Sequence, residues 1–192
     1  MATYGLPKSE KMLAALGRIA LRHGQLDNAM KMVIKDLADV TQEEALHATA
    51  KQMSGQLRER IRTLAKQRLG EGRALVRLEA ILERAQQATT RRNKWFHGTW
   101  GTETPSATQA RRVVMRDARH SFQKAPTVKE LTNLVDDLET ILEDLLNARQ
   151  GFLSNALKKS PTRTPFIARF FCHHQTVNVH VTLPNYLRRQ TI

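Results

Sequence analysis

The sequence predicts an all-α protein, an up-and-down bundle of four to five helices. Apolar residues recur at intervals of three and four, two capping boxes mark helix starts, and glycine and proline gather between the periodic segments. With 192 residues, of which 41% are hydrophobic and 26% charged, the chain is long enough to bury one core. We therefore expect one helical domain over residues 1–157 and a separate tail over residues 158–192.

The first helix is expected over residues 9–39. Its apolar residues follow the spacing of one helical face, and they are Leu16, Ile19, Leu26, Met30, Val33 and Leu37. His23 lies on that face, so we expect it to be buried in the core with its hydrogen bonds satisfied.

Two N-terminal signals mark the next helices. Thr41-Gln-Glu-Glu44 has the form of a capping box and begins a short helix that ends near residue 50. Ser54 is expected to cap a third helix over residues 55–69, because a serine hydroxyl can accept a hydrogen bond from the first turn.

The second half of the domain contains one loop region and one long helix. Residues 99–126 are rich in Thr, Ser, Gly and Pro and are expected to be mostly loop, with a small hairpin formed by residues 112–115 and 120–122. Thr127-Val-Lys-Glu130 is a second capping box and begins a final acidic helix.

The net charge of +13 is concentrated in two segments. Residues 55–97 hold eleven basic and four acidic residues, and residues 158–192 hold six basic and no acidic residues. Such an excess favours a polyanionic partner, nucleic acid foremost, although two solvated faces would give the same counts. The tail has too few apolar residues to fold alone, so we expect it to be disordered or to pair as an edge strand with a neighbour.

Several classes of protein are disfavoured by composition. No run approaches the roughly 18 apolar residues of a membrane span, and a single cysteine, Cys172, favours a reducing, cytoplasmic setting. Cys172, His173 and His174 are adjacent and lack the spacing of a tetrahedral metal site. We therefore expect no membrane contact, no metal and no cofactor.

The end of the fourth helix, expected from about residue 73 to a stop at Gly98, breaks the apolar pattern. Arg92 comes seven positions after Ala85 and continues its apolar stripe, so its guanidinium should meet an anion, a carboxylate or a water-filled cleft. Asn93 and His97 are four residues apart, so the amide can hydrogen-bond the imidazole and orient it.

The run Arg92-Asn93-Lys94-Trp95-Phe96-His97 resembles the signature of the HEPN superfamily (higher eukaryotes and prokaryotes nucleotide-binding domains), an Arg and a His separated by four to six residues. The helical arrangement over residues 8–157 is also similar. The resemblance implies a homodimer whose two motifs form one composite cleft and, in active members, a metal-independent endoribonuclease. Such an enzyme would be a toxin or phage-defence effector, with an antitoxin protein as a candidate partner.

The resemblance also implies roles for the motif residues. His97 would act as base on a ribose 2′-OH or as acid on the leaving 5′-oxygen, which leaves a 2′,3′-cyclic phosphate. Arg92 would stabilise charge on the phosphorane oxygens, and Asn93 would orient His97 or the phosphate.

Residues beside the motif are candidates for RNA contacts. Arg91 and Lys94 would contact phosphates, and Trp95 and Trp100 would stack on bases unless they belong to the core or an interface. Phe96 lies on the apolar stripe and is expected to be buried.

An alternative function remains open. Arg92 would then pair with Asp137 or Glu139 of the last helix, and the protein would be a non-catalytic helical module for nucleic-acid binding or scaffolding.

Overall fold

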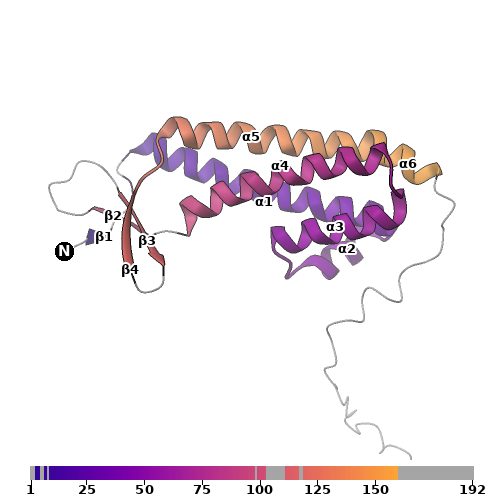
Figure 1. The fold of residues 1–192 in the computed structure, drawn as a ribbon, viewed down its shortest axis with the longest axis horizontal. Coiled ribbons are helices and arrows are strands. Elements are labelled where there is room, and N and C mark those ends of the chain that lie inside the picture. Colours follow the sequence, from indigo (N-terminus) through magenta and orange to yellow (C-terminus); the bar gives the residue numbers. More distant parts are fainter. Residues whose placement is uncertain are drawn as a thin grey trace, which may run out of the picture.

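A computed structural model shows a bundle of helices with a small antiparallel sheet at one end (Figure 1). The structure describes residues 3–4, 7, 9–97, 99–102, 111–116 and 119–159. The predicted all-α bundle is confirmed within these ranges, and the sheet is a minor addition to it.

The predicted helices all form. They are α1 Glu10–Ala38, α2 Gln42–Thr49, α3 Ser54–Leu69, α4 Arg73–Phe96 and α5 Val128–Ala148. After α5, the chain continues through a π-helical turn, Arg149–Leu153, into α6, Ser154–Lys159. The boundary expected between residues 157 and 158 therefore falls inside α6, and residues 160–192 of the tail lie outside the described residues.

Both predicted capping boxes are confirmed. The Thr41 hydroxyl accepts from the Glu44 N–H at 3.2 Å, and the Glu44 carboxylate accepts from the Thr41 N–H at 2.8 Å. Thr127 and Glu130 repeat this exchange at 3.2 and 2.7 Å. Each box satisfies backbone donors that a helix start leaves without an intrahelical partner.

The expected cap of α3 is wrong by one residue. Met53 has the extended backbone of the N-cap position, and Ser54 is the first helical residue. The Ser54 hydroxyl turns inward and donates to Asp27 Oδ1 of α1 at 2.5 Å. A tertiary hydrogen bond has therefore replaced the local cap.

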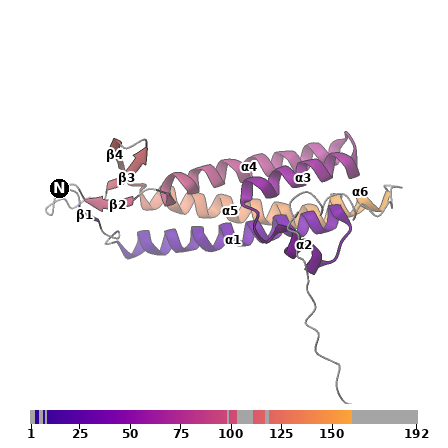
Figure 2. The ribbon, with the colours of Figure 1, turned by 90° about the horizontal axis from the view of Figure 1, so that it is seen from below.

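The directions of α1 and α5 follow from two ion pairs. Arg22 of α1 lies 2.7 Å from Glu139 of α5, and Asp36 lies 2.6 Å from Arg149, at the end of α5. The residue numbers rise together along both helices, so α1 and α5 are parallel (Figure 2).

Helix α3 also runs in the direction of α1. Arg58 of α3 contacts Thr89 of α4, whereas Arg62 lies near Glu83, so α3 and α4 are antiparallel. Helix α5 is antiparallel to α4, as the chain path shows (Figure 1). Short α2 runs in the opposite direction between α1 and α3. Successive helices therefore alternate in direction, as predicted for an up-and-down bundle.

Leucine and isoleucine side chains from α1, α3, α4 and α5 form one continuous core. The largest fully buried members are Ile19, Leu26, Met30, Ile34, Leu37, Leu57, Ile61, Leu78, Leu82, Leu131, Leu134 and Leu138. Removal of this apolar surface from water is the main force that holds the four long helices together.

The sheet has the strand order β1-β2-β3-β4, all antiparallel. Its strands are β1 Thr3–Tyr4, β2 Thr99–Thr102, β3 Arg111–Arg116 and β4 Arg119–Lys124. Strands β3 and β4 form the predicted hairpin, in which Val113 pairs with Phe122. The sheet lies where α4 ends and α5 begins (Figure 1).

Two leucines of α5 provide a test of this core. Leu138 is fully buried, whereas Leu146 is 38% exposed. Leu138→Ala should lower the free energy of unfolding by about 2–5 kcal/mol, because it leaves a cavity among packed side chains. Leu146→Ala is the matched control and should cost roughly 1 kcal/mol or less. Urea denaturation of both variants measures the difference, and equal losses would contradict the described orientation of α5.

Candidate functional site

The last turn of α4 presents Arg92 half-buried, with two contacts that hold its guanidinium in place. Its Nη1 donates to Asn93 Oδ1 at 3.1 Å, and the guanidinium lies over the Phe96 ring, 4.7 Å from the ring centroid. The Nε atom is buried and has no hydrogen-bond partner. Stacking on an aromatic ring orients a guanidinium but does not neutralise its charge.

The carboxylates expected to pair with Arg92 are engaged elsewhere. Asp137 lies 2.6 Å from Arg91, and Glu139 lies 2.7 Å from Arg22. In the part of the chain that the structure describes, no carboxylate forms an ion pair with Arg92. The alternative in which Arg92 is the partner of an acid on the last helix is therefore wrong for these two residues.

Asn93 supports Arg92 and not His97. His97 is the C-cap residue of α4, its side chain is exposed, and its backbone N–H donates to the Asn93 carbonyl at 3.0 Å. Among the described residues, no hydrogen bond joins the side chains of Asn93 and His97. The expected orientation of the imidazole by the Asn93 amide is therefore not observed.

The expected RNA contacts differ in their availability. Arg91 and Lys94 are both exposed, and Arg91 also forms the ion pair with Asp137. Trp95 and Phe96 are half-buried and pack against the core, so the expected burial of Phe96 is met only in part. Trp100, on β2, is half-buried as well. The Arg92 guanidinium covers one face of the Phe96 ring.

A cluster of polar side chains lies between α1, α3 and α4, and we call it the polar cluster. Its members are His23, Asp27, Ser54, Arg58 and Thr89. His23 is buried, as predicted, and its Nε2 lies 3.4 Å from Thr89 Oγ1 and 3.5 Å from Ser54 Oγ.

Both ring nitrogens of His23 have polar neighbours in the polar cluster. Thr89 donates its hydroxyl proton to the Ala85 carbonyl, and Ser54 donates to Asp27. Both hydroxyl oxygens are therefore available to accept a hydrogen bond from Nε2 of His23. On the other side of the ring, Nδ1 lies 3.6 Å from an Asp27 carboxylate oxygen.

Burial lowers the pKa of His23 below its ordinary value. Loss of hydration is the largest cause, and the positive charges of Arg92 and Arg58 lower the pKa further, while Asp27 raises it. Because Arg92 acts on His23, the last turn of α4 and the polar cluster share one electrostatic environment.

The sequence interpretation missed three members of the cluster, Asp27, Arg58 and Thr89, and Arg58 is the most buried charge among them. It is only 7% exposed, its Nη1 donates to Thr89 at 3.3 Å, and its Nε has no hydrogen-bond partner. Burial lowers the pKa of its guanidinium. A signal was available, since Arg58 lies beside Leu57 and three residues before Ile61 on the buried face of α3, just as Arg92 interrupts the stripe of α4.

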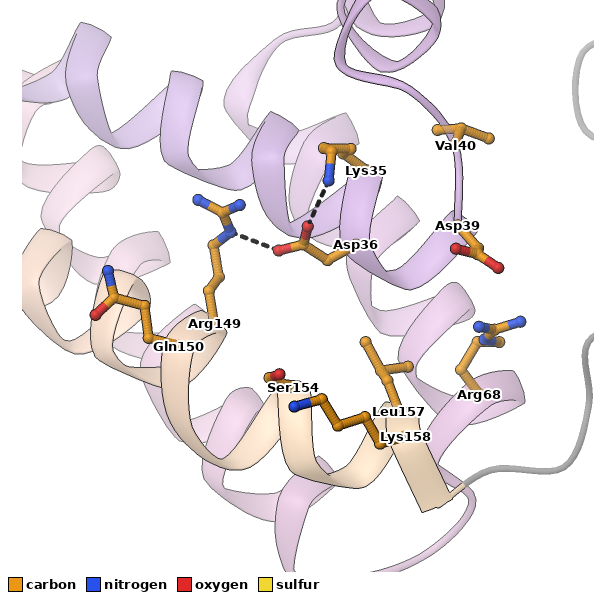
Figure 3. A pocket seen from close by; sticks show the side chains of 10 residues that line it. All are labelled: Lys35, Asp36, Asp39, Val40, Arg68, Arg149, Gln150, Ser154, Leu157 and Lys158. Atoms are coloured by element: carbon orange, nitrogen blue, oxygen red, sulfur yellow. Dashed lines mark hydrogen bonds and ion pairs between the residues drawn. The ribbon is translucent and has the colours of Figure 1, made fainter.

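A second charged region lies at the far end of the bundle, around a hollow of about 610 Å³ (Figure 3). Asp36 points into it between two cations, Lys35 at 3.1 Å and Arg149 at 2.6 Å. Asp36 does not balance both cations, and the whole lining has four basic residues, Lys35, Arg68, Arg149 and Lys158, against the two acidic residues Asp36 and Asp39. The arrangement fastens α1 to the π-helical turn after α5, which is a structural role.

Comparison of the chain with family models, curated proteins and solved structures finds no match. Within the described ranges, no helix has both the length and the apolar character needed to cross a bilayer. Those ranges also contain no group of three His, Cys, Asp or Glu side chains arranged to hold a metal ion, and Cys172 lies outside them. The functional argument therefore rests on the residues of α4 and the polar cluster.

The lowered pKa of His23 predicts a loss of stability in mild acid. Below about pH 6.5 the unfolded chain binds a proton at His23 that the folded chain resists, so stability falls as the pH drops towards the folded-state pKa. The groups that face His23 are Asp27, Arg58 and Arg92.

Unfolding free energies measured from pH 7.5 to 5 test this prediction. His23→Gln should flatten the profile, whereas His47→Gln, at an exposed position on α2, should leave the slope unchanged. An identical slope in His23→Gln and in the unsubstituted protein would show that His23 is not the group responsible.

Proposed function

We propose that this protein is a metal-independent endoribonuclease of HEPN type, with an active site formed by the last α4 turn of two copies. The main support is the state of Arg92, a half-buried guanidinium held in place by Asn93 and Phe96 without a carboxylate partner. A positioned cation without a counter-ion suits the negative charge that develops on a phosphorane.

His97 supplies the proton chemistry in this proposal. It is exposed at the C-terminal end of the same helix, five residues after Arg92. As a base it removes the proton of the ribose 2′-OH, whose oxygen then bonds to phosphorus. As an acid it donates a proton to the 5′-oxygen when the P–O5′ bond breaks.

The proposal requires two copies of the chain. One chain places one histidine at this helix end, whereas the reaction needs both an acid and a base. A second copy would supply the other imidazole and a second Arg92. By the same proposal, the enzyme acts in the cytoplasm as a toxin or phage-defence effector whose activity an antitoxin protein restrains.

A second candidate function is binding of nucleic acid without cleavage. It is favoured by one observation, that His97 lacks a side-chain hydrogen bond to orient it among the described residues, whereas catalytic histidines are usually held by one. Exposed Lys94 and the basic excess of residues 55–97 would serve binding equally well.

Incubation with RNA in EDTA separates the two functions. The endoribonuclease predicts cleavage to 2′,3′-cyclic phosphate ends under these conditions, and His97→Ala should lower the rate by about 10²–10⁴-fold with the melting temperature nearly unchanged. His47→Ala removes an exposed histidine from α2 and should cleave normally. Binding without cleavage by the unsubstituted protein would favour the second function.

Arg92→Lys tests the role of the guanidinium. Lysine keeps the charge but loses the planar fork, so cleavage should fall strongly while folding persists. Arg84→Lys, in the same helix and paired with Asp144, is the control and should keep full activity. Light scattering should show a dimer for all of these proteins, and an active monomer would contradict the shared site.

A further inference from the structure

The hollow at the far end of the bundle has the size of a ligand site. Its volume of about 610 Å³ lies within the range of roughly 300–1,000 Å³ that is usual for small-molecule pockets. Figure 3 shows Lys35 and Asp36 of α1 across the hollow from Ser154 and Lys158 of α6. A single inorganic ion would occupy only a small part of this space, so a ligand with several functional groups fits it better.

The lining of the hollow has an excess of positive charge. Four of its side chains are basic and two are acidic, which leaves an excess of two positive charges. Asp36 lies between Lys35 at 3.1 Å and Arg149 at 2.6 Å, so one carboxylate meets two cations. Lys158 is exposed, and no carboxylate of the described residues pairs with it. A phosphate monoester, with a charge of about −1.5 to −2 at pH 7, would balance this excess.

Helix ends reduce the excess without removing it. Helices α1, α3 and α6 end near the hollow, and the C-terminal end of a long helix carries about half a negative charge. Three such ends would offset at most about 1.5 of the two excess charges. Arg149 is not at a free helix end, because the chain continues through the π-helical turn into α6. The dipoles of the helices therefore do not explain all the cations gathered here.

Two backbone irregularities also lie at the hollow. The π-helical turn Arg149–Leu153 brings Arg149 and Gln150 to its wall, and such turns are frequent at functional sites. Asp39, after the end of α1, has left-handed backbone angles, φ 57° and ψ 48°, where glycine is the usual residue. Among the described residues it is the only non-glycine residue with a positive φ. Irregular backbone of this kind is retained where it positions side chains for binding.

The neutral part of the lining can hold the organic part of a ligand. Gln150 and Ser154 offer hydrogen-bond donors and acceptors. Val40 and Leu157 offer apolar surface. Asp39 can accept hydrogen bonds from hydroxyl or amino groups. A nucleoside monophosphate combines the matching features, since it has one phosphate, sugar hydroxyls and a planar base.

We propose that the hollow binds a nucleoside monophosphate, with Arg149 and Lys158 contacting the phosphate. Asp36 fixes the Arg149 guanidinium through Nε, and a guanidinium has further N–H donors for phosphate oxygens. The ion pair with Asp36 thus fastens the wall of the site, and the remaining positive charge serves the ligand. The hollow lies at the end of the bundle opposite the last turn of α4, so it is separate from the proposed cleavage site (Figure 1).

Isothermal titration with the four ribonucleoside 5′-monophosphates tests the site, with the parent nucleosides and inorganic phosphate as references. At least one monophosphate should bind more tightly than its nucleoside and than inorganic phosphate, because it alone offers both parts. Lys158→Gln should lower that affinity by about 10–100-fold. Lys129→Gln removes an exposed lysine from the opposite end of α5 and should bind normally.

Two further variants test the space and the charge of the hollow. Ser154→Leu fills part of the hollow without changing its charge and should also weaken binding. Asp39→Asn keeps a residue that tolerates left-handed angles and removes one negative charge, so it should tighten binding. Melting temperatures check that each variant folds. A monophosphate that binds no tighter than its nucleoside, or equal affinities in Lys158→Gln and Lys129→Gln, would overturn the proposal.

One further comparison distinguishes a free nucleotide from the 5′-phosphate end of an RNA. Oligonucleotides with a 5′-phosphate and with a 5′-hydroxyl are titrated into His97→Ala, so that cleavage plays no part. A preference for the 5′-phosphate that Lys158→Gln abolishes would identify an RNA end as a ligand. Equal binding of the two oligonucleotides beside tight binding of the monophosphate would identify the free nucleotide. Absence of RNA cleavage by the unsubstituted protein would refute the endoribonuclease and leave this site standing.

Discussion

The cost of burying a guanidinium is the constraint on which the centre of this bundle depends. Arg58 and Arg92 each replace an apolar side chain on the inner face of a helix, and neither has a carboxylate partner among the described residues. Their surroundings compensate in part, through Thr89, Asn93 and the face of an aromatic ring. Burial of these positive charges lowers the stability of the fold, and a cost of this kind is typical of a site that binds an anion.

The rest of the fold supplies the rigidity that such a site needs. Ion pairs join parallel α1 and α5 near their middle, through Glu139, and at their C-terminal ends, through Asp36, and the leucine core fills the space between the helices. His23 remains neutral and hydrogen-bonded inside the polar cluster, so it adds no further positive charge beside the two arginines.

Much of this architecture was accessible from the sequence because it is encoded locally. The capping boxes at Thr41 and Thr127 and the periodic apolar stripes place the starts and faces of the helices. Ser54 shows where local reasoning ends. A serine before a helical stretch normally caps it. Here the Ser54 hydroxyl instead donates to Asp27, 27 residues earlier in the sequence, and Met53 is the N-cap residue. Local patterns contain no information about which helix a side chain will meet.

The sequence by itself determined the helical class, the extent of α1 to α5, the burial of His23 and the anomaly of a charge at Arg92, since each depends on residues within a few turns of one another. Only the tertiary structure decided which acid each arginine meets. From the sequence, Asp137 and Glu139 of α5 were both candidate partners of an arginine on α4. In the structure Asp137 pairs with Arg91 and Glu139 pairs with Arg22. The polar cluster likewise exists only because the bundle brings α1, α3 and α4 together. Core packing sets the rotation and register of each helix, and these decide which side chains of distant helices come into contact.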